Sequence, residues 1–375
     1  MAHAYTPGLK VSRETTLRKV RRLPLAGEVL VHLGQRVAPA TIVARTEVPG
    51  DPHTVNVANI LGIEPGEVPA RMTVAAGEVV TRGQLIASSR GFLGLSRREA
   101  RSPVDGRVEM VSGITGQVTL REHPVPVEIN AYLSGVVGEV LPGEGVVVES
   151  TGALVQGIFG VGGETHGPLR VAVDDPGQPL EAHHVRDDDR GRVLVGGSLV
   201  SQEAIRKAIA VEVAALVAGG VVDQDLTDLL GRSIGVAITG HEDIPLTLLV
   251  TEGFGPMPMA PRTLQLLQAL DGQTACVNGA TQIRAGVLRP EIIIPYPDRP
   301  AGGEPSVCQA TGLAPGTLVR IIREPAFGKL ARVRELPPEL VAIETEARVR
   351  VLRARLEDGA VLTVPRANVE IMEVD

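Results

Sequence analysis

Small and polar residues that suit an anion-binding site recur in the middle of the chain, where short apolar segments end. Each segment is followed by glycine together with serine, threonine, histidine or glutamate. Glycine lets backbone N–H groups approach a ligand closely, and the N-terminus of a following helix favours negative charge. The candidate ligand-binding residues are Gly196, Gly197, Ser198, Gly219, Gly220, Thr239, Gly240, His241, Thr251, Glu252 and Gly253.

The surrounding pattern predicts how these residues are positioned. Apolar segments alternate with helical patterns, and Ser201 suits the N-cap of one helix. This predicts an α/β domain over residues 151–300 with a mainly parallel sheet, whose strands end at one edge. A site there would take an anionic or nucleotide-like ligand, with His241 as the titrating group and Glu252 as a base or ligand partner. The alternative is that the glycines only shape tight turns, because no dinucleotide fingerprint or phosphate loop is present.

Two groups of histidines and carboxylates have the residue types of a metal site. One is His183-His184 with Asp187–Asp189, in a stretch that is typical of a solvated loop, and the other is His241-Glu242-Asp243. Neither has a recognised ligand spacing, so we expect no metal site. The two cysteines, Cys276 and Cys308, are too few for a disulfide framework or an iron–sulfur motif.

Residues 25–150 have little helical periodicity and alternate valine-rich segments with glycine and proline turns. The segments VAAGEVVTRGQLIA and SPVDGRVEMVS resemble the barrel-sandwich hybrid fold of biotinyl and lipoyl domains. They are also similar to the related domain of Rnf-type and sodium-translocating NADH:quinone reductase subunits. Biotinyl and lipoyl carriers attach their cofactor to a lysine, but this chain has none between Lys19 and Lys207. We therefore expect a scaffold domain with no covalently attached cofactor.

The C-terminal segment LAPGTLVRIIREPAFGKLARVREL resembles a KOW motif of transcription elongation and ribosomal proteins. The matching residues are Gly316, Val319, Ile321, Gly328 and Val333. The resemblance implies an SH3-like β-barrel over residues 311–375 that binds RNA or protein.

Arginines form two candidate contact surfaces for nucleic acid or a partner. The chain has a net charge of −7, yet its first 26 residues hold six lysines and arginines against Glu14. We expect residues 1–24 to form a basic arm that contacts nucleic acid, an anionic surface or an acidic partner, or that lies across an acidic body. The alternating arginines of the barrel either form a stripe or pair with Glu344, Glu346 and Glu357. The candidate contact residues are Arg18, Lys19, Arg21, Arg22, Arg348 and Arg350.

Composition excludes several classes of function. Aromatic residues make up 2% of the chain, too few for a base-stacking surface. No apolar run reaches the roughly 20 residues of a membrane span, and no secretory signal is visible, so we expect a cytoplasmic protein. We expect a multidomain, non-catalytic adaptor or scaffold that binds protein, with RNA or DNA as a further partner and homo-oligomers as an open question. The alternatives are a redox-complex or enzyme subunit that binds a nucleotide-like ligand, and a purely structural role.

Overall fold

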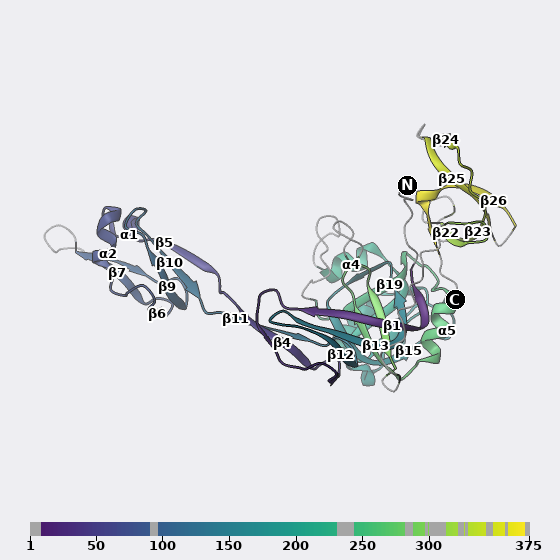
Figure 1. Cartoon of the computed structure of the whole chain (residues 1–375), viewed down its shortest axis with the longest axis horizontal. Coiled ribbons are helices and arrows are strands. Elements are labelled where there is room, and N and C mark those ends of the chain that lie inside the picture. Colours follow the sequence, from purple (N-terminus) through teal and green to yellow (C-terminus); the bar gives the residue numbers. More distant parts are fainter. Residues whose placement is uncertain are drawn as a thin grey trace.

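The computed structural model describes residues 9–90, 97–230, 244–281, 288–296, 313–321, 329–342, 348–356 and 359–371, together with Arg299 and Ala326. The described residues are mostly β-structure, with 49% in strands and 15% in helices, so sheets rather than helices form the framework. Figure 1 shows a large central body, a smaller unit that stands away from it, and a β-unit formed by the C-terminal residues.

A mixed sheet of 12 strands forms the body, in the order β14-β19-β18-β16-β15-β20-β21-β13-β12-β3, with β1 beside β13 and β17 beside β18. The parallel pairs are β15–β16, β16–β18, β17–β18 and β18–β19, and the other pairs of this sheet are antiparallel. The expected mainly parallel sheet is therefore one part of a mixed sheet. The strands are β1 (Val11–Arg22), β3 (Arg36–Val37), β12 (Gly135–Leu141), β13 (Gly145–Gln156), β14 (Phe159–Val161), β15 (Glu164–Val171), β16 (Val193–Val195), β17 (Leu199–Val200), β18 (Ala215–Val221), β19 (Thr247–Phe254), β20 (Thr274–Asn278) and β21 (Glu291–Pro295).

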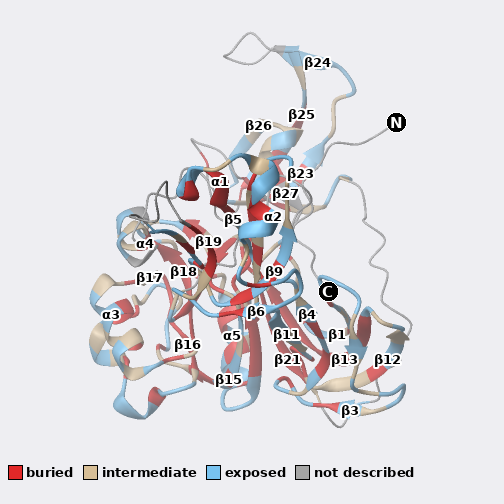
Figure 2. Cartoon of the chain, turned by 90° about the vertical axis from the view of Figure 1, so that its left-hand side faces the viewer, coloured by how far each residue is buried: buried red, intermediate tan, exposed pale blue. Residues whose placement is uncertain are grey.

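Helices cover both faces of the parallel strands. On one face, residues of α3 (Gln202–Val211) and α4 (Asp223–Leu230) join one apolar core. On the other face, Leu264 and Leu267 of α5 (Pro261–Ala269) join a second core. Ser201 caps α3, as its sequence predicts, because its hydroxyl accepts a hydrogen bond from the backbone N–H of Ala204. Figure 2 shows the buried residues concentrated in the strands between these helices.

Most of the described residues of the expected basic arm form a strand. Residues 11–22 are strand β1, which lies antiparallel to β13 with Val11 opposite Val155 and Arg22 opposite Gly145. Strand β13 runs across the expected domain boundary at residue 150. It has β1 along one edge, while β12 and β21 share the other edge. The body therefore combines residues from both expected domains.

A small lobe, residues 49–124, is connected to the body by a pair of strands. Strands β4 (Ile42–Val48) and β11 (Val125–Asn130) pair with Val48 opposite Val125, and β2 (Glu28–Val29) extends their sheet. The lobe has its own apolar core and stands away from the body (Figure 1). Its elements are β5 (Pro52–Asn56), α1 (Val57–Leu61), η1 (Pro65–Glu67), α2 (Val68–Arg71), β6 (Val79–Val80), β7 (Leu85–Arg90), β8 (Arg97–Arg101), β9 (Gly106–Val111) and β10 (Gln117–Glu122).

The C-terminal β-unit, residues 313–371, is a sheet in the order β24-β25-β23-β22-β27, with β26 beside β25. Alternate residues of its strands, among them Val319, Val333 and Leu352, fill a separate core. Its strands are β22 (Leu318–Ile321), β23 (Leu330–Glu335), β24 (Leu340–Ala342), β25 (Arg348–Leu356), β26 (Val361–Pro365) and β27 (Val369–Ile371).

Short 3₁₀ helices occur at Ala182–His184, Asp187–Asp189 and Arg366–Asn368. Within the described ranges, no helix is long and apolar enough to cross a membrane.

Candidate functional site

The structure brings most of the predicted glycine-rich residues together at one edge of the body. Gly220 in β18 lies opposite Leu199 of β17 and Gly253 of β19, and Gly196 directly follows β16. This convergence follows from the parallel strands, whose carboxyl ends meet at the same edge. Thr239, Gly240 and His241, which the sequence places at this edge, lie outside the described residues.

The backbone N–H groups at this edge are bonded within the protein. Gly196 donates to the carbonyl of Val217 at 2.7 Å, Gly219 donates to that of Gly197 at 2.7 Å, and the N–H groups of Gly197 and Ser198 share the carbonyl of Gln178. These donors are therefore not free to hold an anion.

The glycines of β18 also have no open space beside them. A Cβ atom added to Gly219 would overlap the carbonyl oxygen of Met257, and one added to Gly220 would overlap that of Gly255. Glycine is required there because two backbone segments lie in contact. This arrangement matches the alternative in which the glycines serve the fold.

The polar side chains at the same edge have structural partners. The Ser198 hydroxyl donates to the carbonyl of Gly177 at 2.7 Å, and the Thr251 hydroxyl donates to that of Ala218 at 3.4 Å. The Glu252 carboxylate accepts a hydrogen bond from the N–H of Ala260, the N-cap of α5, at 3.1 Å. Glu252 thus stabilises a helix start, a role different from the predicted base or ligand partner.

The basic residues of β1 are paired with carboxylates of the body. On one face of the strand, Arg18 lies 2.5 Å from Glu139 and 3.3 Å from Glu149, and Arg22 lies 3.2 Å from Glu144. These contacts agree with the expectation that the basic segment lies across an acidic body. They give no support to the expected contact of Arg18 and Arg22 with nucleic acid.

The other face of β1 contributes to a polar cluster that the sequence analysis missed. Lys19 forms an ion pair with Glu291, and the Arg21 guanidinium binds both carboxylate oxygens of Glu164 at 2.7 and 2.6 Å. Both cations lie over the ring of the buried Tyr132, whose hydroxyl donates to Glu291 at 3.3 Å. The cluster connects the first strand to β15 and β21.

Titratable groups beside this cluster are held in their protonated forms. Burial, reinforced by the negative charge of Glu291, raises the pKa of Tyr132 well above its usual value. Burial likewise raises the pKa of the Cys276 thiol to about 12, so the thiol is no nucleophile at neutral pH. Tyr132 has φ of 68°, a left-handed conformation that is uncommon outside glycine. Neither this conformation nor its contacts left a signal in the sequence.

The acidic loop near His183 holds a buried ion pair, contrary to its expected solvated character. Asp189 has no exposed side-chain surface and binds Arg170, while its Oδ2 also accepts the N–H of Arg186 at 2.7 Å. Burial and the neighbouring His183 lower the pKa of His184. Among the residues with described positions, no group of three or more histidines, cysteines and carboxylates could hold a metal ion.

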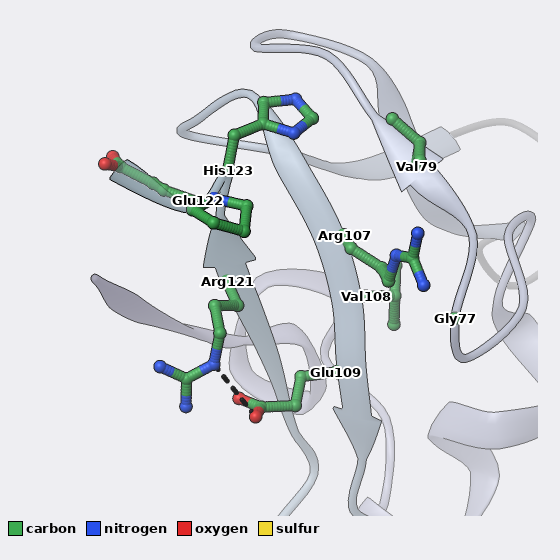
Figure 3. A pocket seen from close by; sticks show the side chains of 9 residues that line it. Gly77, Val79, Arg107, Val108, Glu109, Arg121, Glu122 and His123 are labelled. Atoms are coloured by element: carbon green, nitrogen blue, oxygen red, sulfur yellow. Dashed lines mark hydrogen bonds and ion pairs between the residues drawn. The ribbon is translucent and has the colours of Figure 1, made fainter. Parts of the chain in front are cut away.

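A cavity of about 520 Å³ opens on the outer face of the small lobe (Figure 3). Arg107 of β9 lies directly opposite Arg121 of β10 on this face. Arg121 is neutralised, because its Nε lies 2.9 Å from Glu109 and its Nη1 donates to the carbonyl of Gly50. The cavity is lined by Gly77, Val79, Arg107, Val108, Glu109, Arg121, Glu122, His123 and Pro124.

The C-terminal β-unit has a similar feature. Arg332 of β23 lies directly opposite Arg355 of β25, and both line a cavity of about 350 Å³ with Leu318, Leu330, Ala331 and Leu356. Within the described ranges, no carboxylate lies within ion-pair distance of either arginine. The sequence analysis missed this pair, because the register between two strands has no sequence signature.

The predicted contact residues Arg348 and Arg350 lie elsewhere on the C-terminal β-unit. Both are exposed, and they lie opposite Ala342 and Leu340 of β24. The neighbouring Arg353 forms an ion pair with Glu335 at 2.9 Å. Glu344, Glu346 and Glu357, the expected alternative partners of these arginines, lie outside the described residues.

Comparisons with known proteins give no name for this arrangement. Neither the protein-family models nor the curated proteins contain a match to the chain.

Proposed function

We propose that this protein is a non-catalytic adaptor that joins macromolecules in a larger assembly through the small lobe and the C-terminal β-unit. One observation carries the proposal. Each of these peripheral units has two arginines directly opposite each other on neighbouring strands, at the rim of a cavity.

Such pairs are unfavourable in the isolated protein where no carboxylate compensates them, and in the small lobe Glu109 compensates only Arg121. Like charges directly opposite on neighbouring strands destabilise a sheet, and arginine is enriched in the binding surfaces of proteins. An anionic partner would neutralise the uncompensated arginines, so the cost in the free protein is consistent with a binding role. The body offers a contrast, because Arg18, Arg21 and Arg22 of β1 already have carboxylate partners.

The resemblances in the sequence support the same conclusion. A barrel-sandwich hybrid in the N-terminal part would serve as a rigid scaffold, since the small lobe contains no lysine for a biotinyl or lipoyl group. An SH3-like barrel of the KOW type at the C-terminus would bind protein or RNA. Both assignments are part of this proposal.

The alternative is an enzyme or redox-complex subunit that binds a nucleotide-like ligand at the glycine-rich edge. The described part of that edge does not favour it, because the N–H groups of Gly196, Gly197, Ser198 and Gly219 already donate to protein carbonyls. Phosphate sites of this type need free donors at the ends of the strands.

Purification of the full chain from its own cells, without crosslinking, separates the two functions. We expect a protein or nucleic acid to copurify in stoichiometric amount. It should be lost when Asn-Gly replaces residues 49–124, or when Arg332→Glu removes the arginine pair of the C-terminal β-unit. The Asn-Gly turn fits the junction because Val48 and Val125 are opposite each other. Recovery of the chain alone, or of the chain with only a bound nucleotide or flavin, would contradict the adaptor proposal.

A further inference from the structure

We propose that the cavity of the small lobe is a binding site for a carboxylate carried on an apolar chain. The proposal concerns the chemistry of this one cavity and does not depend on the adaptor function, since a free organic acid and a protein segment would both satisfy it.

The charges around the cavity leave one cation without a partner. Glu109 neutralises Arg121, and Glu122 lies 3.0 Å from the His53 ring. In Figure 3 the Glu122 side chain extends to the side away from Arg107. Within the described ranges, the side chain of Arg107 has no hydrogen-bond or ion-pair partner, although it is exposed at the cavity. A ligand with one negative charge would neutralise the guanidinium of Arg107.

The shape of the cavity accommodates an apolar chain next to that charge. Val79 lies opposite Arg107 in the register of β6 and β9, and it is 51% exposed. Pro124 also lines the cavity, and Gly77 leaves the facing side open, because a Cβ atom there would meet nothing within 4 Å. A volume of about 520 Å³ is within the range of small-ligand sites.

A carboxylate fits this site better than a phosphate monoester. A carboxylate brings one charge and a planar pair of oxygens that matches the guanidinium of Arg107. A phosphate monoester brings close to two charges. The second charge would lie near the carboxylate of Glu109, which also lines the cavity, and like charges repel.

Methyl NMR of the full chain with labelled valine and methionine tests the site. The probes are hexanoate, hexan-1-ol and hexyl phosphate, together with the tripeptide acetyl-Ala-Val-Leu with either a free or an amidated C-terminus. We expect hexanoate or the free-acid peptide, at up to about 10 mM, to shift the methyl signals of Val79, which is 51% exposed at the cavity. The signal of Met259, which is buried in the body, should stay unchanged. The carboxylate that binds more tightly shows whether the natural ligand is a free organic acid or the C-terminus of a protein chain.

Two variants give the decisive comparison. Arg107→Gln should weaken carboxylate binding by about tenfold or more, whereas Arg71→Gln, on an exposed residue of α2 outside the cavity, should leave it unchanged. Equal binding of hexan-1-ol or of the amidated peptide would overturn the proposal, as would tighter binding of hexyl phosphate. It is also overturned if Arg107→Gln binds like the original chain, or if neither carboxylate shifts the methyl signals of Val79.

Discussion

Asp189 and Arg170 form a two-point ion pair in the interior of the body. The Nε and Nη2 atoms of Arg170 donate to the two carboxylate oxygens of Asp189 at 2.6 and 2.5 Å, and the Asp189 side chain has no exposed surface. Nη2 of Arg170 also donates to the carbonyl of His184. The pair thereby fixes the acidic loop to strand β15.

Asp189→Asn should be strongly destabilising. The substitution leaves the guanidinium of Arg170 buried without a countercharge, a change that typically costs about 3–5 kcal/mol. Urea unfolding followed by circular dichroism measures the loss. Asp188→Asn is the matched control, because the neighbouring Asp188 side chain is 71% exposed and should contribute little. Equal midpoints for the two variants would show that the buried pair contributes nothing to stability.

Tyr132 should make the protein less stable at alkaline pH. Its pKa is raised in the folded state, so above about pH 10 the unfolded chain loses this proton while the folded chain keeps it. The free energy of unfolding then falls with rising pH, by up to about 1.4 kcal/mol per pH unit for this group. The stabilisation that Tyr132 contributes is fully present below the pKa of tyrosine in the unfolded chain. It is lost as the pH rises toward the higher pKa of Tyr132 in the folded protein.

Ultraviolet titration at the tyrosinate absorption band measures this effect. The original chain should show one tyrosine that ionises only when the protein unfolds, and Tyr132→Phe should lack that late step. Tyr296→Phe serves as the control and should keep the late step. Burial also raises the pKa of Tyr296, but its side chain is only partly buried and its hydroxyl donates to the carbonyl of Arg13. A Tyr132 that ionised reversibly in the folded protein near pH 10 would contradict the prediction.

Gly219→Ala should destabilise the body without affecting any ligand. The new methyl group would overlap the carbonyl of Met257, so the backbone must move, and we expect a loss of about 2 kcal/mol or more. Gly163→Ala is the control, because a Cβ atom there would meet nothing within 4 Å. Thermal unfolding distinguishes the two. An unchanged midpoint for Gly219→Ala would show that the edge is open and would reopen the predicted ligand site.

Arg332→Glu should stabilise the C-terminal β-unit while weakening its binding of an anionic partner. The new carboxylate would lie opposite Arg355, replacing a repulsive pair by an attractive one worth about 0.2–1 kcal/mol. Hydrogen exchange of the amides of β23 and β25 reports the stability of this unit alone. Arg334→Glu changes the net charge equally, but the register shift between Val333 and Glu335 leaves Arg334 with no opposite residue. Faster exchange in Arg332→Glu than in Arg334→Glu would contradict the prediction.

Local signals in the sequence predicted the α/β part of the body. The apolar segments that became β16, β18 and β19 alternate with helical patterns, and the N-cap of α3 depends only on Ser201 and the next three residues. Such features are short in range, so a single sequence contains them.

Long-range contacts explain what the sequence did not predict. Leu17, Lys19 and Arg21 are spaced two residues apart, a pattern that is compatible with a strand and with a solvated basic segment. The segment forms a strand because it pairs with β13, which is distant in the sequence. Glycine is needed at position 219 because the carbonyl oxygen of Met257 lies beside it in the fold, and Met257 is distant in the sequence. The same holds for Arg107, whose lack of a countercharge follows from the pairing of Arg121 with Glu109.

Strand β13 cannot complete its pairing in the sheet until the ribosome has made β21. Residues 152–156 of β13 pair with β21, whose first residue follows the last residue of β13 by about 135 positions. At 5–20 residues per second, synthesis of that interval takes about 7 to 27 s. During this time that five-residue part of the β13 edge is open to pairing with other nascent chains. The small lobe finds all its strand partners among its own residues and is complete before β13 has been made.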